Sequence, residues 1–173
     1  MIREIIEWIK TIVVSILIAL LITTFVKPTM VQGQSMEPTL WENDLLIINQ
    51  LLYNRDEPGR GDIVVFESNQ LDEDGKPKLF IKRVIGLPEE EITISDGKVY
   101  INNDILSEDY LAEEYTHGDI KEIIPENKIF VIGDNRSSSL DSRSPEIGII
   151  DFEDIVGQAV MRLYPFEGLG KIE

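Results

Sequence analysis

A lysine inside an apolar stretch is the residue of this sequence best suited to act as a base. Residues 79–87 read LFIKRVIGL, which has the pattern of a β-strand. Side chains alternate between the two faces of a strand, so Lys82 and Arg83 must point to opposite sides. If one face is covered by the core, a lysine there loses water, its pKa falls, and its neutral amine can accept a proton. If the strand lies at a sheet edge, both charged groups reach water instead.

An isolated serine in a turn-forming stretch is the candidate nucleophile. Residues 31–40 read VQGQSMEPTL, and Ser35 lies between a glycine and a proline of this stretch. A nucleophilic serine needs an exposed Oγ and nearby backbone N–H groups that stabilise an oxyanion. Ordinary turns share this pattern, so the motif alone does not establish a reactive residue.

A third polar segment has the composition of a loop that supports a site. Residues 133–143 read GDNRSSSLDSR and directly follow the apolar stretch 128–132. Such a density of hydrogen-bonding groups is typical of a structured loop around functional residues. It is also typical of a surface loop rich in Asx turns.

The composition excludes several classes of site. Without cysteine, the chain can form no disulfide, thiolate nucleophile or cysteine zinc site. The chain has a single histidine, His117, so a histidine-rich metal site is excluded. We expect His117 at the surface. We also expect the protein to bind neither a metal nor a cofactor. The 32 acidic residues against 16 basic ones give a net charge of −16, which repels nucleic acid.

The first 27 residues have the pattern of a membrane anchor. Thr11–Val26 is an uncharged run between Lys10 and Lys27. As a helix it spans about 24 Å, and apolar residues before it extend the span toward a hydrocarbon core of about 30 Å. The basic residues before the run favour a cytoplasmic amino terminus and an extracytoplasmic body. Two alternatives are a cleavable signal peptide, which lacks its usual small-x-small exit, and a buried core helix.

The remaining residues, 28–173, predict a mostly β domain. An Asp-Gly turn at residues 96–97 between two alternating runs predicts a hairpin. Polar loops are expected at 67–78, and a short helix or a loop at 103–122. The predicted strands are 44–49, 63–66, 79–87, 91–95, 98–101, 128–132 and 157–163.

Four segments together resemble, in the same order, the conserved boxes of bacterial type I signal peptidases. These segments are residues 34–40, 60–66, 80–88 and 133–143. The resemblance implies a signal-peptidase-type β domain after one transmembrane helix, with a reduced inserted subdomain at 89–127. It implies a single-pass enzyme of the cell membrane, whose catalytic domain lies on the extracytoplasmic side.

The resemblance also implies roles for individual residues. Ser35 matches the nucleophile and Lys82 the general base. Ser139 matches a serine that hydrogen-bonds this lysine, and Asp141 and Arg143 match an ion pair that holds the loop. Two further residues match structural members of the same box, Asp134 and Arg136. Five apolar residues match the substrate cleft and its shallow pockets for small side chains, namely Val31, Met36, Leu40, Val65 and Ile81.

One position departs from the pattern of Gram-negative members. Gly33 lies where those enzymes have a serine whose hydroxyl helps to bind the oxyanion. The Ser35 N–H would then act with another donor, or in a weaker oxyanion hole. This glycine, the single anchor and the small size resemble Gram-positive members.

The implied activity is that of a membrane-bound serine endopeptidase. It would cleave signal peptides from secretory preproteins after a small-x-small motif, so its partners would be preproteins and the lipid bilayer. One alternative is a related protease that cleaves itself, as SOS repressors do, or that cleaves one dedicated substrate. The other alternative is a membrane-tethered β module that binds partners without catalysis. The sequence predicts no oligomeric state.

Overall fold

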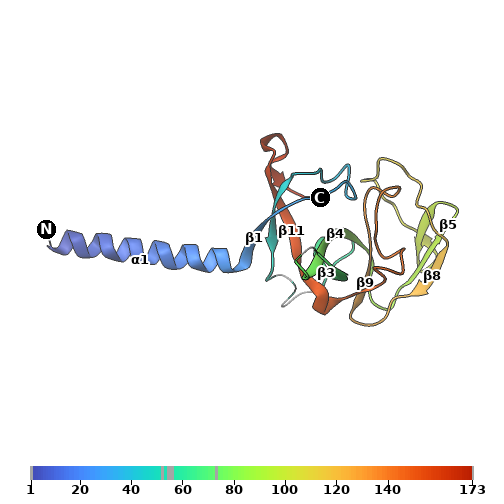
Figure 1. Ribbon diagram of the computed structural model, residues 1–173, viewed down its shortest axis with the longest axis horizontal. Coiled ribbons are helices and arrows are strands. Elements are labelled where there is room, and N and C mark those ends of the chain that lie inside the picture. The colour runs from blue at the N-terminus through green and yellow to red at the C-terminus, as the bar shows by residue number, and fades with distance from the viewer. Residues whose placement is uncertain (1, 52, 54–56, 73, 173) are drawn as a thin grey trace.

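The computed structural model describes residues 2–51, 53, 57–72 and 74–172, and it consists of a long helix followed by two antiparallel β-sheets (Figure 1). Helix α1 (Ile2–Phe25) extends away from the β part and continues directly into strand β1 (Val26–Met30). Among the described residues, no helical stretch combines the length and apolarity that crossing a bilayer requires. The predicted apolar run includes residues 18, 19 and 21–26, whose side chains are outside the described part of the structure.

The larger sheet places the strand of Lys82 in its interior. Its strand order is β1-β2-β11-β3-β4-β9-β10, and β12 pairs with β11. Strand β4 lies between β3 and β9 from Arg83 onward, whereas its residues up to Lys82 pair with β3 alone. The bounds are β2 Leu45–Asn49, β3 Ile63–Leu71, β4 Pro77–Gly86, β9 Lys128–Ile132, β10 Ile150–Asp151, β11 Ile155–Tyr164 and β12 Gly170–Lys171, with 3₁₀ helices at Phe152–Asp154 and Phe166–Gly168.

Strands β3 and β4 form a longer hairpin than the sequence pattern predicts. The predicted polar loop 67–78 is largely strand, because the pairing continues to Leu71 opposite Pro77. The Asp72 carboxylate accepts the backbone N–H groups of Asp74 and Lys76 and so closes the turn. The outer part of the hairpin is largely exposed, so it needs no apolar alternation. Its polar sequence therefore concealed the strands.

The smaller sheet has the strand order β7-β6-β5-β8. Asp96 and Gly97 both have positive φ, 51° and 78°, in the predicted hairpin turn. The segment 103–122 contains no helix among its residues, all of which are described; it holds β7, a loop and the start of β8. The bounds are β5 Glu91–Ser95, β6 Lys98–Ile101, β7 Asp104–Ile105 and β8 Ile120–Ile123.

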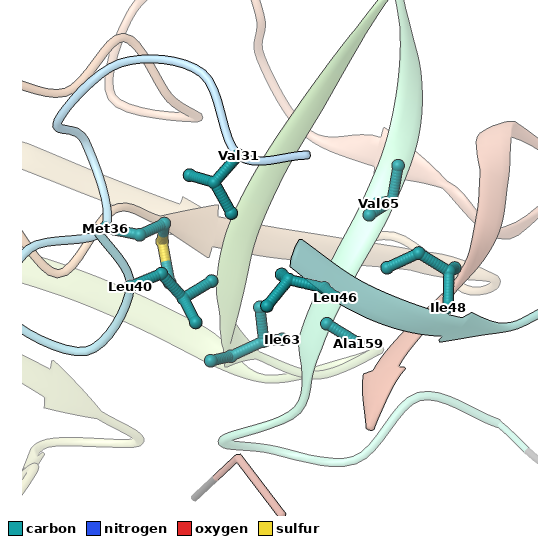
Figure 2. Packing of buried hydrophobic residues seen from close by; sticks show 8 residues of the cluster. All are labelled: Val31, Met36, Leu40, Leu46, Ile48, Ile63, Val65 and Ala159. Atoms are coloured by element: carbon teal, nitrogen blue, oxygen red, sulfur yellow. The ribbon is translucent and has the colours of Figure 1, made fainter. Parts of the chain in front are cut away.

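The two sheets share a hydrophobic core. One cluster joins Ile85 and Phe130 of the larger sheet to Ile92 and Ile94 of the smaller sheet. A second cluster lies beneath the loop that follows β1 and contains the eight residues drawn in Figure 2. The smaller sheet is therefore packed against the strands that carry the candidate site.

Candidate active site

Ser35 lies in the loop between β1 and β2. The Val31 N–H donates to the Asp44 carbonyl at 2.9 Å, which closes the base of this loop. The side chains of Met36 and Leu40 are 1% and 0% exposed and hold the loop down on the cluster shown in Figure 2. The loop is thus fixed by packing on one side, while Ser35 itself stays half-buried at its surface.

The side chain of Lys82 lies against Ser35. Its Nζ is 2.8 Å from the Ser35 Oγ and 2.8 Å from the Ile81 carbonyl oxygen. The lysine is 2% exposed. Burial lowers its pKa from 10.5 to about 8, although the charges of Asp141 and Asp134 act in the opposite direction. In a fraction of the protein molecules the Lys82 amine is therefore neutral near pH 7 and can accept the serine proton.

Arg83 points to the opposite face of β4 and is buried as well. Its Nε and Nη2 donate to the two oxygens of Asp134 at 2.9 and 2.8 Å. It also donates to the Gly61 carbonyl and to Thr39 Oγ1. Lys82 and Arg83 can both be buried because Arg83 pairs with the buried carboxylate of Asp134. The argument from strand alternation did not include this possibility. The available signal was an aspartate directly after an apolar strand.

Asp141 and Arg143 form the ion pair that the resemblance implies. Arg143 donates its Nε and Nη2 to the Asp141 oxygens at 2.8 and 2.9 Å. The Gly133 N–H donates to the same carboxylate at 3.0 Å. Burial alone would raise the pKa of Asp141, but Arg143 and this N–H hold it below its usual value. Asp141 therefore remains charged and fixes the start of the loop.

Ser139 does not make the expected hydrogen bond to Lys82. Its Oγ is buried and forms no hydrogen bond of normal geometry among the described residues, although it lies close enough to Asp141 to help lower the pKa of that carboxyl. It lies instead over Gly133, where an added Cβ would be 2.2 Å from this oxygen and 2.4 Å from the Ser35 carbonyl oxygen. The glycine thus allows the loop after β9 to lie directly on the backbone of Ser35.

Arg136 reaches away from the site. Its Nε donates to the Gly133 carbonyl at 3.1 Å, and its guanidinium pairs with Glu108 and Thr116. Sequence reasoning assigned no role to Glu108 or Thr116, because nothing local marks them as partners of a residue in another segment.

A cleft of about 920 Å³ contains Ser35 and Lys82. Three of the five predicted pocket residues line it, namely Val31, Val65 and Ile81. Met36 and Leu40 do not, because their side chains turn into the core beneath the loop. Leu46 lines the cleft and was missed, although the in–out alternation of β2 could have indicated it. Lys76 and Lys78 lie at the part of the cleft formed by the β3–β4 hairpin.

The two remaining residues discussed from the sequence are His117 and Gly33. His117 is exposed, as expected, and stacks edge-on with Tyr115. Gly33 lines the cleft with a φ of 79°, and no atom lies within 4 Å of the position a Cβ would take. A side chain at position 33 would have space but a strained backbone. In the described part of the chain, no cluster of His, Asp or Glu could hold a metal ion.

Comparison with known proteins gives matches over most of the chain. A family model described as "Signal peptidase, peptidase S26" matches residues 5–164. A probable signal peptidase I-2 of Synechocystis is 39% identical over 93% of this chain and 74% of its own length. Signal peptidase I of Leptolyngbya laminosa is 40% identical (96% and 83%), and that of Bacillus licheniformis 36% (96% and 92%). A crystal structure of a signal peptidase I from Enterococcus faecalis superposes with a TM-score of 0.50 at 35% identity, over 60% of this chain and 97% of that one.

Proposed function

Because this chain belongs to the peptidase S26 family of signal peptidases, which are serine peptidases, we propose that Ser35 and Lys82 form its catalytic pair. The pair would cleave signal peptides from secretory preproteins, with Ser35 as nucleophile and Lys82 as general base. The observation that supports this most directly is the 2.8 Å contact between the Ser35 Oγ and the Nζ of a lysine that is 2% exposed.

The proposed reaction needs only these two side chains for proton transfer. Neutral Lys82 takes the Ser35 proton as Oγ attacks the scissile carbonyl carbon. The C–N bond then breaks, and the ammonium of Lys82 gives its proton to the leaving amine. Water attacks the resulting ester while Lys82 accepts one of its protons, which finally returns to Ser35. The products are a new carboxylate and a new amino terminus.

The oxyanion would be stabilised by backbone donors. Gly33 offers no hydroxyl, so the Ser35 N–H is the donor assigned by this proposal. The positive φ at Gly33 favours glycine, so no side chain occupies the open space at this position of the cleft.

The substrate would bind as an added strand beside β4. Strand β3 pairs with β4 from Pro77 to Arg83, whereas β9 pairs with it only from Arg83 onward. The described residues before Arg83 thus have a strand partner on one side only, and they line the cleft on the other. The apolar side chains of Val31, Val65 and Ile81 would form shallow pockets, so we expect cleavage after a small-x-small motif.

The organisation of the chain would place this cleft at a membrane. In this proposal residues 1–27 are a single-pass anchor with a cytoplasmic amino terminus, and residues 28–173 are the extracytoplasmic domain, with 89–127 as its inserted subdomain. The uncharged run from Thr11 to Val26 supports the anchor. Helix α1 passes directly into β1, and residues Thr29 and Met30 of β1 already line the cleft.

The test is cleavage of a preprotein by the full chain in lipid vesicles. Ser35→Ala and Lys82→Ala should each abolish cleavage, because each removes one member of the proton transfer. Ser95→Ala and Lys98→Ala are matched controls, since these residues pair with each other in the small sheet, do not line the cleft, and should leave cleavage unchanged. Near-wild-type cleavage by either variant of the catalytic pair would refute the assignment. Several unrelated preproteins as substrates would separate general processing from a single dedicated substrate.

A further inference from the structure

A buried ion pair links the small sheet to the loop behind Ser35. The side chains of Arg136 and Glu108 are 1% and 9% exposed, and the arginine donates to both carboxylate oxygens. Burial alone would lower the pKa of Arg136, but Glu108 raises it above its usual value, so the arginine stays charged. A buried arginine of this kind depends on its carboxylate, because removing one partner leaves an uncompensated charge.

Glu108 belongs to a stretch that we call the bridging segment, residues 106–118. Its first residue is tied to the small sheet by the Leu106 N–H, which donates to the Val99 carbonyl. Near its end the Thr116 N–H donates to the Gly97 carbonyl, and the Thr116 hydroxyl accepts from Arg136. The segment is therefore anchored at both ends to the small sheet and in its middle to the loop after β9.

One branch of contacts leads from the bridging segment to the backbone of Ser35. Arg136, held by Glu108, donates to the Gly133 carbonyl. Gly133 lies against the Ser35 carbonyl, and the Asn135 N–H donates to that same carbonyl oxygen at 3.0 Å. The position of the nucleophile's main chain is thus set by a loop whose guanidinium anchor lies on Glu108.

A second branch leads to the strand that carries Lys82. The ring of Tyr110 covers the guanidinium of Arg83, with 4.0 Å between the ring centre and Cζ. The Tyr110 hydroxyl donates to Glu108 at 2.6 Å, so the two branches meet at one carboxylate. Arg83 is the direct neighbour of Lys82 in β4, and it also donates a hydrogen bond to Thr39 in the loop of Ser35.

We propose that Glu108 and Tyr110 are positioning residues for the catalytic pair. Neither contacts Ser35 or Lys82, but together they hold the two segments that set the distance between the pair. This inference rests on the proposed function. It predicts that the small sheet serves the reaction by supporting the catalytic pair, in addition to its own folding.

The test measures kcat, KM and the pH profile of the full-length enzyme with a signal-peptide substrate. Glu108→Gln and Tyr110→Leu should lower kcat by about 10- to 100-fold with KM nearly unchanged, because a displacement of about 1 Å has such an effect on a reacting pair. Looser packing also admits water to Lys82 and raises its pKa, so the acidic limb of the profile should move to higher pH. Tyr110→Phe keeps the ring over Arg83 and should retain most of the activity.

Two controls separate positioning from general weakening. Glu114→Gln neutralises an exposed acid in the same segment and should change neither kcat nor the pH limb. Ile101→Val removes one methyl group from the core of the small sheet and should lower the melting temperature without slowing the reaction. If Glu108→Asp restores kcat relative to Glu108→Gln, the carboxylate itself is confirmed as the anchor.

The inference is overturned if folded Glu108→Gln and Tyr110→Leu keep the wild-type kcat, or if Ile101→Val slows the reaction equally. Melting curves recorded on the same samples show that the variants are folded, and Tyr110→Leu remains informative should Glu108→Gln fail to fold. An inactive Ser35→Ala together with a fully active Glu108→Gln defeats this inference alone. An active Ser35→Ala defeats the proposed function as well.

Discussion

The Nζ of Lys82 lies 2.8 Å from the Oγ of Ser35, although 47 residues separate them in the chain. The lysine is 2% exposed, and its charged form is disfavoured because few water molecules can reach it. The burial of Lys82 therefore affects activity, because the neutral amine is the active form. It also affects the stability of the fold, because burying the charged amine costs free energy.

The activity should depend on pH through Lys82. With a pKa of about 8 and the neutral amine as the active form, kcat/KM should rise about tenfold per pH unit below pH 8 and level off above it. A pH series from 5.5 to 10 on the full-length enzyme checks this. His117→Asn is the control and should leave the curve unchanged. An acidic limb that disappears in His117→Asn would contradict the assignment of the base.

Replacing Lys82 by an uncharged side chain should stabilise the fold at neutral pH. Its folded pKa, about 8, lies below its ordinary value of 10.5, so between these values the unfolded state binds more protons and stability rises with pH. Below pH 8 the full free-energy cost of burying the charged form of Lys82 is present. Lys82→Met should therefore raise the free energy of unfolding at pH 7 by about 1–3 kcal/mol, and by less at pH 10. Urea unfolding at both pH values measures this, and lower stability of the variant at pH 7 would count against it.

Breaking the Arg83–Asp134 pair should be costly. Asp134→Ala leaves a buried guanidinium without its carboxylate, for which we expect a loss of about 3–5 kcal/mol in the free energy of unfolding. The double variant Arg83→Met/Asp134→Leu should recover much of that loss, since no uncompensated charge remains. Lys128→Met, which breaks a partly exposed pair with Asp151, is the control and should cost about 1 kcal/mol or less. A loss in Asp134→Ala no larger than in this control would contradict the prediction.

Two apolar positions should separate selectivity from stability. Ile81 lines the cleft and is half-buried, so Ile81→Ala should enlarge a pocket and increase cleavage after larger residues. Leu40 is fully buried outside the cleft, and Leu40→Ala should cost about 2–5 kcal/mol of stability without changing the preferred residues. Cleavage of a substrate library, together with denaturant unfolding of both variants, checks the pair. A changed preference in Leu40→Ala would contradict this division.

Local patterns were sufficient for much of the β-structure. The Asp96-Gly97 pair has the positive φ values that such a turn requires, and it joins the two predicted strands. The apolar runs around Val64 and Phe130 are strands, because β-type runs bounded by turn residues reflect burial on a sheet. The outer half of the β3–β4 hairpin had no such pattern, since exposed strands can be polar on both faces.

The sequence by itself determined that Lys82 and Arg83 point to opposite faces, because alternation is a property of every strand. It could not determine what covers each face. Only the tertiary structure decided that Ser35 meets one and Asp134 the other, that Met36 turns into the core, and that Glu108 anchors Arg136. These contacts join residues from separate segments, and they depend on strand register and sheet packing, which no local pattern specifies.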